Sequence, residues 1–228
     1  MTCVNDSGML EIKQGGTPQA PVIYSGNGQT PVGGIRVEAD NVVVQGFKLD
    51  NPPAPGIVAL GNNITLQDNT INHPQGDDFD GIRFFGNGIK ILHNTISNTT
   101  NTDGHHADCM QTFTNGKPST SDLLIASNKC LDIANQCLMA EGPGDPEGGH
   151  GGGVSKDWTV TGNDCQFGAS QGYELQYIND VTVTNNDVTA MHGGGDDRGG
   201  GGDKAVGLCH AEPAKVEGNK HDGVAQEV

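Results

Sequence analysis

Short runs in which apolar and polar residues alternate recur along most of the chain, and one run follows a fixed pattern. It reads apolar, any, apolar, any, any, Asn, any, and then usually an apolar residue, and its Asn returns at spacings of 23 to 35 residues. Such alternation predicts a β-strand with one buried face. The six copies are Ile64–Ile71, Ile89–Ile96, Leu123–Cys130, Trp158–Cys165, Val181–Val188 and Ala214–His221, and an earlier variant, Val42–Leu49, has Phe47 in place of the Asn.

A second strand-like run precedes each copy of this motif. One such pair of strands cannot bury its apolar face alone, so neighbouring units must stack and share a core, which predicts a solenoid. The seven pairs predict about seven coils, beginning near residues 34, 56, 81, 109, 137, 172 and 205. We expect the two open ends to be covered either by short segments, residues 1–20 and the last few residues, or by a partner molecule.

The recurring Asn has two physical explanations. Asn tolerates the left-handed backbone of a tight corner. Stacked Asn side chains can also donate and accept hydrogen bonds along an internal ladder, at the spacing between adjacent strands. The alternative is that Asn only marks surface turns. The ladder requires Asn69, Asn94, Asn128 and Asn163 to lie in one column.

The composition agrees with an all-β chain. Gly accounts for 36 residues and aromatic residues for only 4% of the chain, and Val, Ile and Thr dominate the strand-like runs. Because the repeats run through almost the whole sequence, we expect a single domain over residues 1–228. Loop insertions are predicted at residues 97–108, 141–157 and 192–204.

A family resemblance is carried by four segments: VEADNVVVQGF (Val37–Phe47), ILHNTI (Ile91–Ile96), HADCMQTF (His106–Phe113) and CLMAEGP (Cys137–Pro143). These segments resemble secreted bacterial proteins of the right-handed parallel β-helix (pectate-lyase-like) superfamily, some of which are related to uronan lyases and mannuronan C5-epimerases. The resemblance implies a right-handed coil and a polysaccharide substrate that contains uronic acids. The chain lacks the DPH motif of the epimerases and the polygalacturonase motifs, so no catalytic residue is carried over.

The formal net charge of −16 argues against binding to nucleic acid or to anionic membranes. The chain has no apolar run long enough to span a membrane, and Met1–Leu10 lacks the apolar region of a signal peptide. The resemblance implies a secreted, extracellular protein, and we expect a monomer. An anionic polysaccharide would be repelled by this charge unless a cation or a local basic group intervenes.

The six cysteines fit no zinc-binding spacing. Cys109 and Cys137 begin consecutive strand runs, and Cys130 and Cys165 end consecutive Asn motifs. Each pair should stack on adjacent coils within disulfide range, which predicts Cys109–Cys137 and Cys130–Cys165 bonds. The alternative is that all four are small buried apolar residues in a reduced protein.

Alternation in the first strand of each coil sorts its side chains into core and surface rows. The outward rows and the nearby turns gather polar and aromatic residues on one sheet face. The predicted catalytic cluster on this face is His106, Asp108, Arg83, Gln111 and His105. The predicted substrate-binding residues are Arg36, Phe85, Phe113, Glu141, Glu174 and Gln176, of which the two Phe offer aromatic surface to a sugar ring or pack under a loop.

This cluster suits β-elimination or C5-epimerisation of a uronic acid. Both reactions remove the proton next to a carboxyl group, which requires a group that neutralises the carboxylate and a base within reach. Arg83 and Gln111 are the predicted neutralising groups. His106 is the predicted base, oriented by Asp108, and His105 is the second choice.

Three alternatives stay open. Asp77, Asp78 and Asp80 could hold a Ca²⁺ that neutralises the substrate carboxylate, since calcium prefers such oxygen ligands. Asp80 and Asp108 could instead be the acid and base of a glycoside hydrolase, or could only cap stacked turns. The protein could also be a non-catalytic glycan-binding or structural protein that uses the same face to hold sugar.

Overall fold

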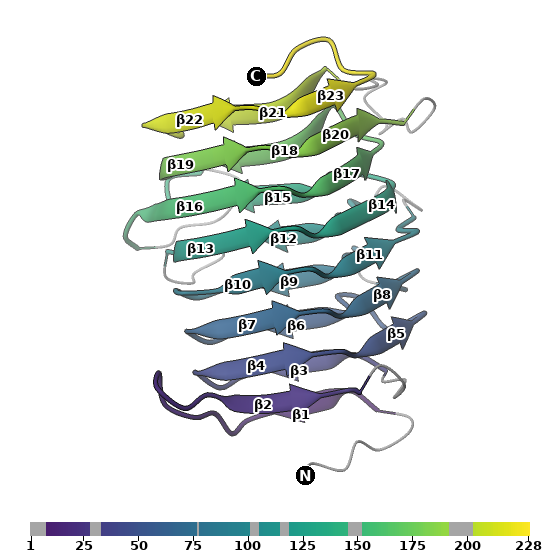
Figure 1. Ribbon diagram of the computed structural model, residues 1–228, viewed down its shortest axis with the longest axis vertical. Coiled ribbons are helices and arrows are strands. Elements are labelled where there is room, and N and C mark those ends of the chain that lie inside the picture. Colours follow the sequence, from purple (N-terminus) through teal and green to yellow (C-terminus); the bar gives the residue numbers. More distant parts are fainter. Residues whose placement is uncertain are drawn as a thin grey trace.

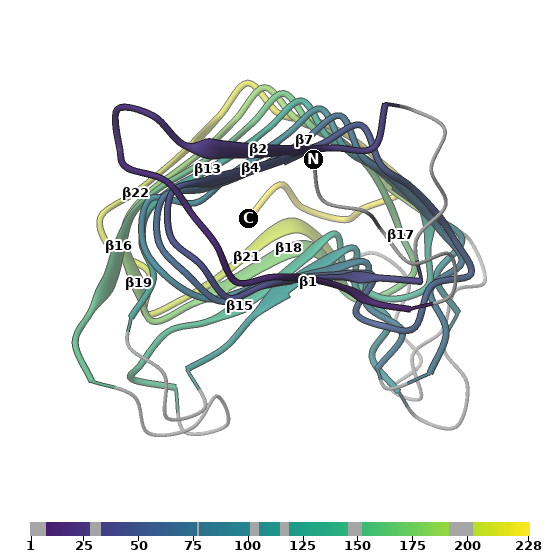
Figure 2. The same ribbon diagram turned by 90° about the horizontal axis from the view of Figure 1, so that it is seen from below.

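The computed structural model describes residues 8–27, 33–76, 78–100, 105–114, 119–145, 152–191 and 203–228. These residues form three parallel sheets, of eight, eight and seven strands, which stack rung upon rung into one elongated β-helix (Figure 1). Figure 2 looks along the stack and shows the rungs superposed around a common interior. No helix in this part of the chain is long and apolar enough to span a membrane. The predicted all-β solenoid is confirmed.

Each rung passes through the three sheets in turn. Sheet 1 contains β1 (Leu10–Ile12), β3 (Ile35–Val37), β6 (Ile57–Ala59), β9 (Ile82–Phe84), β12 (Met110–Thr112), β15 (Leu138–Glu141), β18 (Gln171–Gln176) and β21 (Lys204–Cys209). Sheet 2 contains β2 (Val22–Ser25), β4 (Val42–Gln45), β7 (Ile64–Gln67), β10 (Lys90–Leu92), β13 (Ser121–Ala126), β16 (Ser155–Thr161), β19 (Ile178–Thr184) and β22 (Ala214–Glu217). Sheet 3 contains β5 (Lys48–Asp50), β8 (Thr70–Asn72), β11 (Thr95–Ser97), β14 (Lys129–Ile133), β17 (Asp164–Phe167), β20 (Asp187–Ala190) and β23 (Lys220–Asp222).

The structure has one rung more at its N-terminal end than the sequence predicts. β1 pairs in parallel with β3, and β2 pairs with β4. Residues 10–25 therefore form a rung rather than a cover. The prediction for the C-terminal end is confirmed, because the amide of Val206 donates to the carbonyl of Glu227, which lays the last residues along β21.

The recurring Asn residues form an internal ladder. In each step the side-chain amide donates to Oδ1 of the Asn one rung further on, over 2.9–3.0 Å. The same Oδ1 also accepts the backbone amide of the preceding Asn, as Asn128 Oδ1 does for Asn94. Asn69, Asn94, Asn128, Asn163 and Asn186 are buried. The ladder pairs polar groups that the corner would otherwise bury without partners.

The left-handed backbone lies one residue before the ladder. Asp68, His93, Ser127 and Asn185 have φ of 53–57°, and Gly162 has φ of 64°. Two neighbouring residues therefore have different roles at this corner. The residue before the Asn turns the chain, and the Asn itself connects the rungs. Of the two explanations for the recurring Asn, the ladder is the one that the structure supports.

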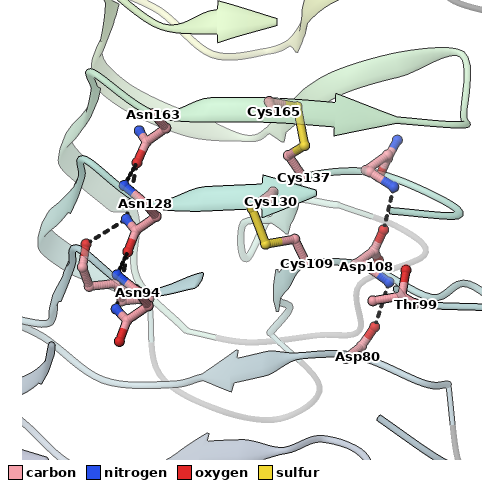
Figure 3. Close-up of a disulfide and its surroundings, with 12 residues drawn as sticks. Asp80, Asn94, Thr99, Asp108, Cys109, Asn128, Cys130, Cys137, Asn163 and Cys165 are labelled. Atoms are coloured by element: carbon pink, nitrogen blue, oxygen red, sulfur yellow. Dashed lines mark hydrogen bonds between the residues drawn. A yellow bond between two sulfur atoms is a disulfide. The ribbon is translucent and has the colours of Figure 1, made fainter. Parts of the chain in front are cut away.

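Disulfides cross the core within single rungs. Cys109 bonds to Cys130 and Cys137 bonds to Cys165, with Cα atoms 5.8 and 5.9 Å apart (Figure 3). The predicted pairs Cys109–Cys137 and Cys130–Cys165 are wrong. They do stack on adjacent rungs, as predicted, but stacked side chains point in the same direction. The two cysteines of one rung lie on different sheets and point toward each other, as a disulfide requires.

Candidate functional site

The outer face of sheet 1 carries the predicted row of side chains. Strand register places Arg83 beside Gln111, Gln111 beside Met139, and Met139 beside Glu174. In the next row, Glu141 lies beside Gln176. These residues come from β9, β12, β15 and β18, and parallel pairing brings them onto one face although they are far apart in sequence.

Asp80 and Asp108 lie just before β9 and β12 and are fully buried. Oδ1 of Asp80 accepts the backbone amide of Asp108 at 3.0 Å (Figure 3). Oδ1 of Asp108 accepts the backbone amide of Gln136 at 2.9 Å. The two aspartates therefore continue a ladder along this corner, comparable to the Asn ladder at the other. Neither carboxyl group can touch a substrate without a rearrangement of the rungs.

The Arg83 side chain forms ion pairs with carboxylates of nearby residues. Its guanidinium contacts Asp80, and Nη2 lies 3.4 Å from Oδ2 of Asp78. The other oxygen of Asp78 lies 3.4 Å from Nδ1 of His105. The Phe113 ring covers the guanidinium, with its centroid 5.6 Å from Cζ. Arg83 is therefore a neutralised and largely covered cation.

Burial shifts both aspartates toward their neutral form. It raises the pKa of Asp80 to about 7, although Arg83 and the Asp108 amide oppose the shift. It raises the pKa of Asp108 well above its ordinary value, and the neighbouring carboxylate of Asp80 adds to this effect. Hydrogen bonds from the Gln136 amide and the Asn135 side chain oppose this rise in the pKa of Asp108, but among the described residues no cation pairs with it as Arg83 pairs with Asp80.

An open pocket of about 320 Å³ lies further along the same face, over β15 and β18. Carboxylate, amide and imidazole groups dominate its walls, so the pocket offers hydrogen-bond donors and acceptors to a polar ligand. The lining residues are His106, Asn135, Gln136, Met139, Glu141, Ala169, Ser170, Gln171, Glu174 and Gln176.

Both carboxylate oxygens of Glu174 are held by hydrogen bonds. One of its oxygens accepts from Nε2 of Gln136, and the other accepts from Nε2 of Gln176 at 2.6 Å. Glu141 also lines the pocket and is only 9% exposed. Strand spacing and rise put the Cα atoms of Glu141 and Glu174 roughly 8 Å apart on one sheet face.

The predicted catalytic cluster is thus divided into two groups. Arg83, Asp108 and Gln111 belong to the buried network, with Nε2 of Gln111 3.5 Å from Oδ2 of Asp108. His106 is exposed and lines the pocket. Its link to Asp108 is through the backbone, because the Asp108 amide donates to the His106 carbonyl. His105 lies with Asp78 and with the ring of Phe79, 5.5 Å away.

The predicted substrate-binding residues are also divided. Glu141, Glu174 and Gln176 meet in the pocket. Phe85 and Phe113 pack edge to face, 5.1 Å apart and partly buried. Arg36 pairs with Glu38 at 2.5 Å, five rungs before the strand of Glu174.

The calcium prediction finds no support among the described residues. Both oxygens of Asp80 are occupied, by Arg83 and by the amide of Asp108. The oxygens of Asp78 face Arg83 and His105, and Asp77 lies outside the described residues. In that part of the chain, no three or more His, Cys, Asp or Glu residues are grouped to hold a metal.

Residues 33–220 match a family model described as the right-handed beta helix region. The chain belongs to this family. In the comparisons with curated proteins and with solved structures, nothing matched. Membership of the right-handed β-helix family agrees with the three parallel sheets and leaves the reaction open.

The sequence analysis missed four polar pocket residues, Asn135, Gln136, Ser170 and Gln171. Gln136 lies two residues before β15 and Gln171 is the first residue of β18. By strand register, both hold the position that Asp80 and Asp108 hold before β9 and β12. This shared position was the signal in the sequence that could have identified Gln136 and Gln171 as site residues. Lys204 is in register with Gln171 on the next strand, which brings a lysine beside the pocket.

Proposed function

We propose that this β-helix protein is a carbohydrate-active enzyme that binds a polysaccharide across the rungs of sheet 1 and acts on it at the pocket. One observation carries the proposal: neighbouring rungs bring the exposed His106 together with Glu141 and Glu174 in one open polar pocket. The disulfides agree with secretion, because such bonds persist in oxidising compartments.

For the reaction we propose removal of the proton next to the carboxylate of a uronic acid, as in a polysaccharide lyase or a C5-epimerase. His106 is the proposed base, since imidazole exchanges protons near neutral pH. The substrate carboxylate needs a neutralising group, and Arg83 is occupied by Asp80. We therefore assign that role to Lys204 and the side-chain amide of Gln171, which are neighbours in register.

A glycoside hydrolase is the second candidate, and the position of two carboxylates in the pocket favours it. Glu141 and Glu174 line the same pocket, and a glycosidase uses two carboxyl groups that flank the glycosidic bond. They replace the predicted pair Asp80 and Asp108, which is fully buried.

The test is a panel of neutral and uronic-acid polysaccharides incubated with the protein. A lyase gives an unsaturated product that absorbs in the ultraviolet, and an epimerase incorporates solvent deuterium at C5. A hydrolase gives new reducing ends without that absorbance. The proposed chemistry requires H106A to abolish the first two signals, and the hydrolase requires E174Q to abolish the third.

His221→Ala is the matched control, because His221 is an exposed histidine of β23, away from the pocket and from the left-handed corners. Its variant should behave as the wild type. Retained polysaccharide binding with no product from any member of the panel would instead indicate a non-catalytic glycan-binding protein. A panel in which nothing binds would contradict the proposed function.

A further inference from the structure

Asp108 supports the pocket from beneath without lining it. Its Oδ1 accepts from the backbone amide of Gln136 at 2.9 Å and from Nδ2 of Asn135 at 2.8 Å, and both partners line the pocket. Gln136 in turn donates its side-chain amide to Glu174. A continuous chain of hydrogen bonds therefore runs from a buried carboxyl group to the acid of the pocket.

The surroundings of Asp108 disfavour a negative charge. The residue is fully buried, and burying a charge without a partner is costly. Among the described residues, the charged groups nearby are the carboxylates of Asp80 and Glu174 and the guanidinium of Arg83, which pairs with Asp80. Within that part of the chain, ionised Asp108 would stand between two carboxylates without a cation paired to it.

The second oxygen of Asp108 has room for a proton. Oδ2 has one weak partner, Nε2 of Gln111 at 3.5 Å, which is beyond the usual range of a hydrogen bond. Oε1 of the same Gln111 amide is buried and accepts no hydrogen bond. A half-turn of the amide, which changes its shape very little, brings this acceptor to the O–H of a neutral Asp108.

We propose that Asp108 is a positioning residue for Glu174, acting through Gln136, and that it does so as a neutral carboxylic acid. A neutral acid keeps the acceptor oxygen that holds Asn135 and Gln136 and places no charge beside Glu174. The positioning role rests on the proposed function of the pocket, whereas the protonation state stands independently of it. The raised pKa of Asp108 agrees with this assignment.

Asp108→Asn is the decisive variant, because asparagine has the shape of a neutral aspartic acid and keeps the acceptor oxygen. It should retain the wild-type melting temperature and, once a substrate is identified, the wild-type activity. At neutral pH, the infrared band of protonated carboxylic acids should lose one component relative to the wild type. Asp108→Ala should lower stability and reduce kcat roughly ten- to hundredfold, as loss of orientation does.

Ser155→Ala is the matched control for D108A. Ser155 is a buried residue of sheet 2 that accepts the backbone amide of Thr120 at 3.0 Å, so its variant also leaves a buried amide without an acceptor. S155A should lower stability and leave kcat unchanged. Crystal structures should show Glu174 displaced in D108A and retained in D108N.

Two results would overturn the inference. An unchanged infrared band in D108N would show that Asp108 is ionised. Loss of stability in D108N equal to that in D108A would show that the charge itself is needed. Both measurements are made on the protein alone, so they remain decisive if no polysaccharide yields a product, which would count against the proposed function and not against the neutral acid.

Discussion

At the scale of single residues, side-chain oxygens that accept a backbone amide of an adjacent rung recur around the molecule. Asn128 does this in the buried ladder, and Asp108 does it beneath the pocket. Asn62 does it on the exposed corner, where its Oδ1 accepts the amide of Asn87 at 3.0 Å. Water can replace a lost hydrogen-bond partner only at an exposed site. Hydrogen bonds of the same geometry should therefore contribute more to stability when they are buried.

Asn128→Ala should therefore lower the free energy of unfolding by roughly 2–4 kcal/mol, because it leaves buried amides of the ladder without partners. Asn62→Ala, the matched exposed variant, should cost less than about 1 kcal/mol. Chemical denaturation of both variants measures the difference. Equal losses of stability in the two variants would show that burial does not determine how much the ladder contributes to stability.

Asp80 should make stability depend on pH. Its folded pKa of about 7 lies above the value of roughly 3.9 for an unfolded aspartate. The folded state therefore binds more protons between these values, so stability is greatest below about pH 4 and falls as pH rises toward 7, by at most about 1.4 kcal/mol per pH unit. Denaturation at a series of pH values should show a shallower slope for Asp80→Asn, and an unchanged slope would contradict this assignment.

At the scale of elements, each disulfide cross-links one of the two rungs that support the pocket. Cys109 and Cys137 directly follow Asp108 and Gln136, and their bonds close 21- and 28-residue separations. Peptide mapping without reduction should link Cys109 to Cys130. The double variant C109A/C130A should lose roughly 3 kcal/mol of stability, as expected for closing a loop of this length. A recovered Cys109–Cys137 peptide would restore the pairing first predicted from sequence.

The sequence predicted those features that depend on period and register. The strand alternation around Ile64–Gln67, the column through Asn69 and the outward row through Arg83 and Gln111 follow from local patterns that repeat in every rung. Patterns of this kind identify which residues share a rung or a column. They do not tell which way a side chain at a corner turns, because alternation breaks there.

The failures lie at such corners. Strand register places Cys109 and Cys137 on adjacent rungs. The spacing of the cysteines does not tell toward which sheet the Cys109 side chain points. Asp80 and Asp108 read as outward acids, and the structure turns both inward to backbone amides. The pocket arises where polar residues at the same corner, Gln136 and Gln171, replace these acids.

At the scale of the whole molecule, the rungs contact mainly their neighbours. Stability in such a solenoid is approximately a sum of rungs and of the interfaces between them. The two ends are therefore the weak points, since a terminal rung has only one neighbour. At the C-terminal end the last residues occupy the missing place: Glu227 covers β21 through its carbonyl, and its Oε1 lies 3.2 Å from Nδ2 of Asn219, at the end of the ladder.

Removal of residues 224–228 should therefore loosen one end without unfolding the other. The truncation frees the backbone amides of Ala205 and Val206 on β21 and the ladder amide of Asn219. Hydrogen exchange should accelerate in β21, β22 and β23, whereas β6 and β9 should keep wild-type protection. Glu227→Gln, which keeps an acceptor at the ladder end, should leave all of these strands protected. A truncation that exposes every rung equally would mean that the stack unfolds as a single cooperative unit, and the tail would then stabilise the whole molecule and not only its last rung.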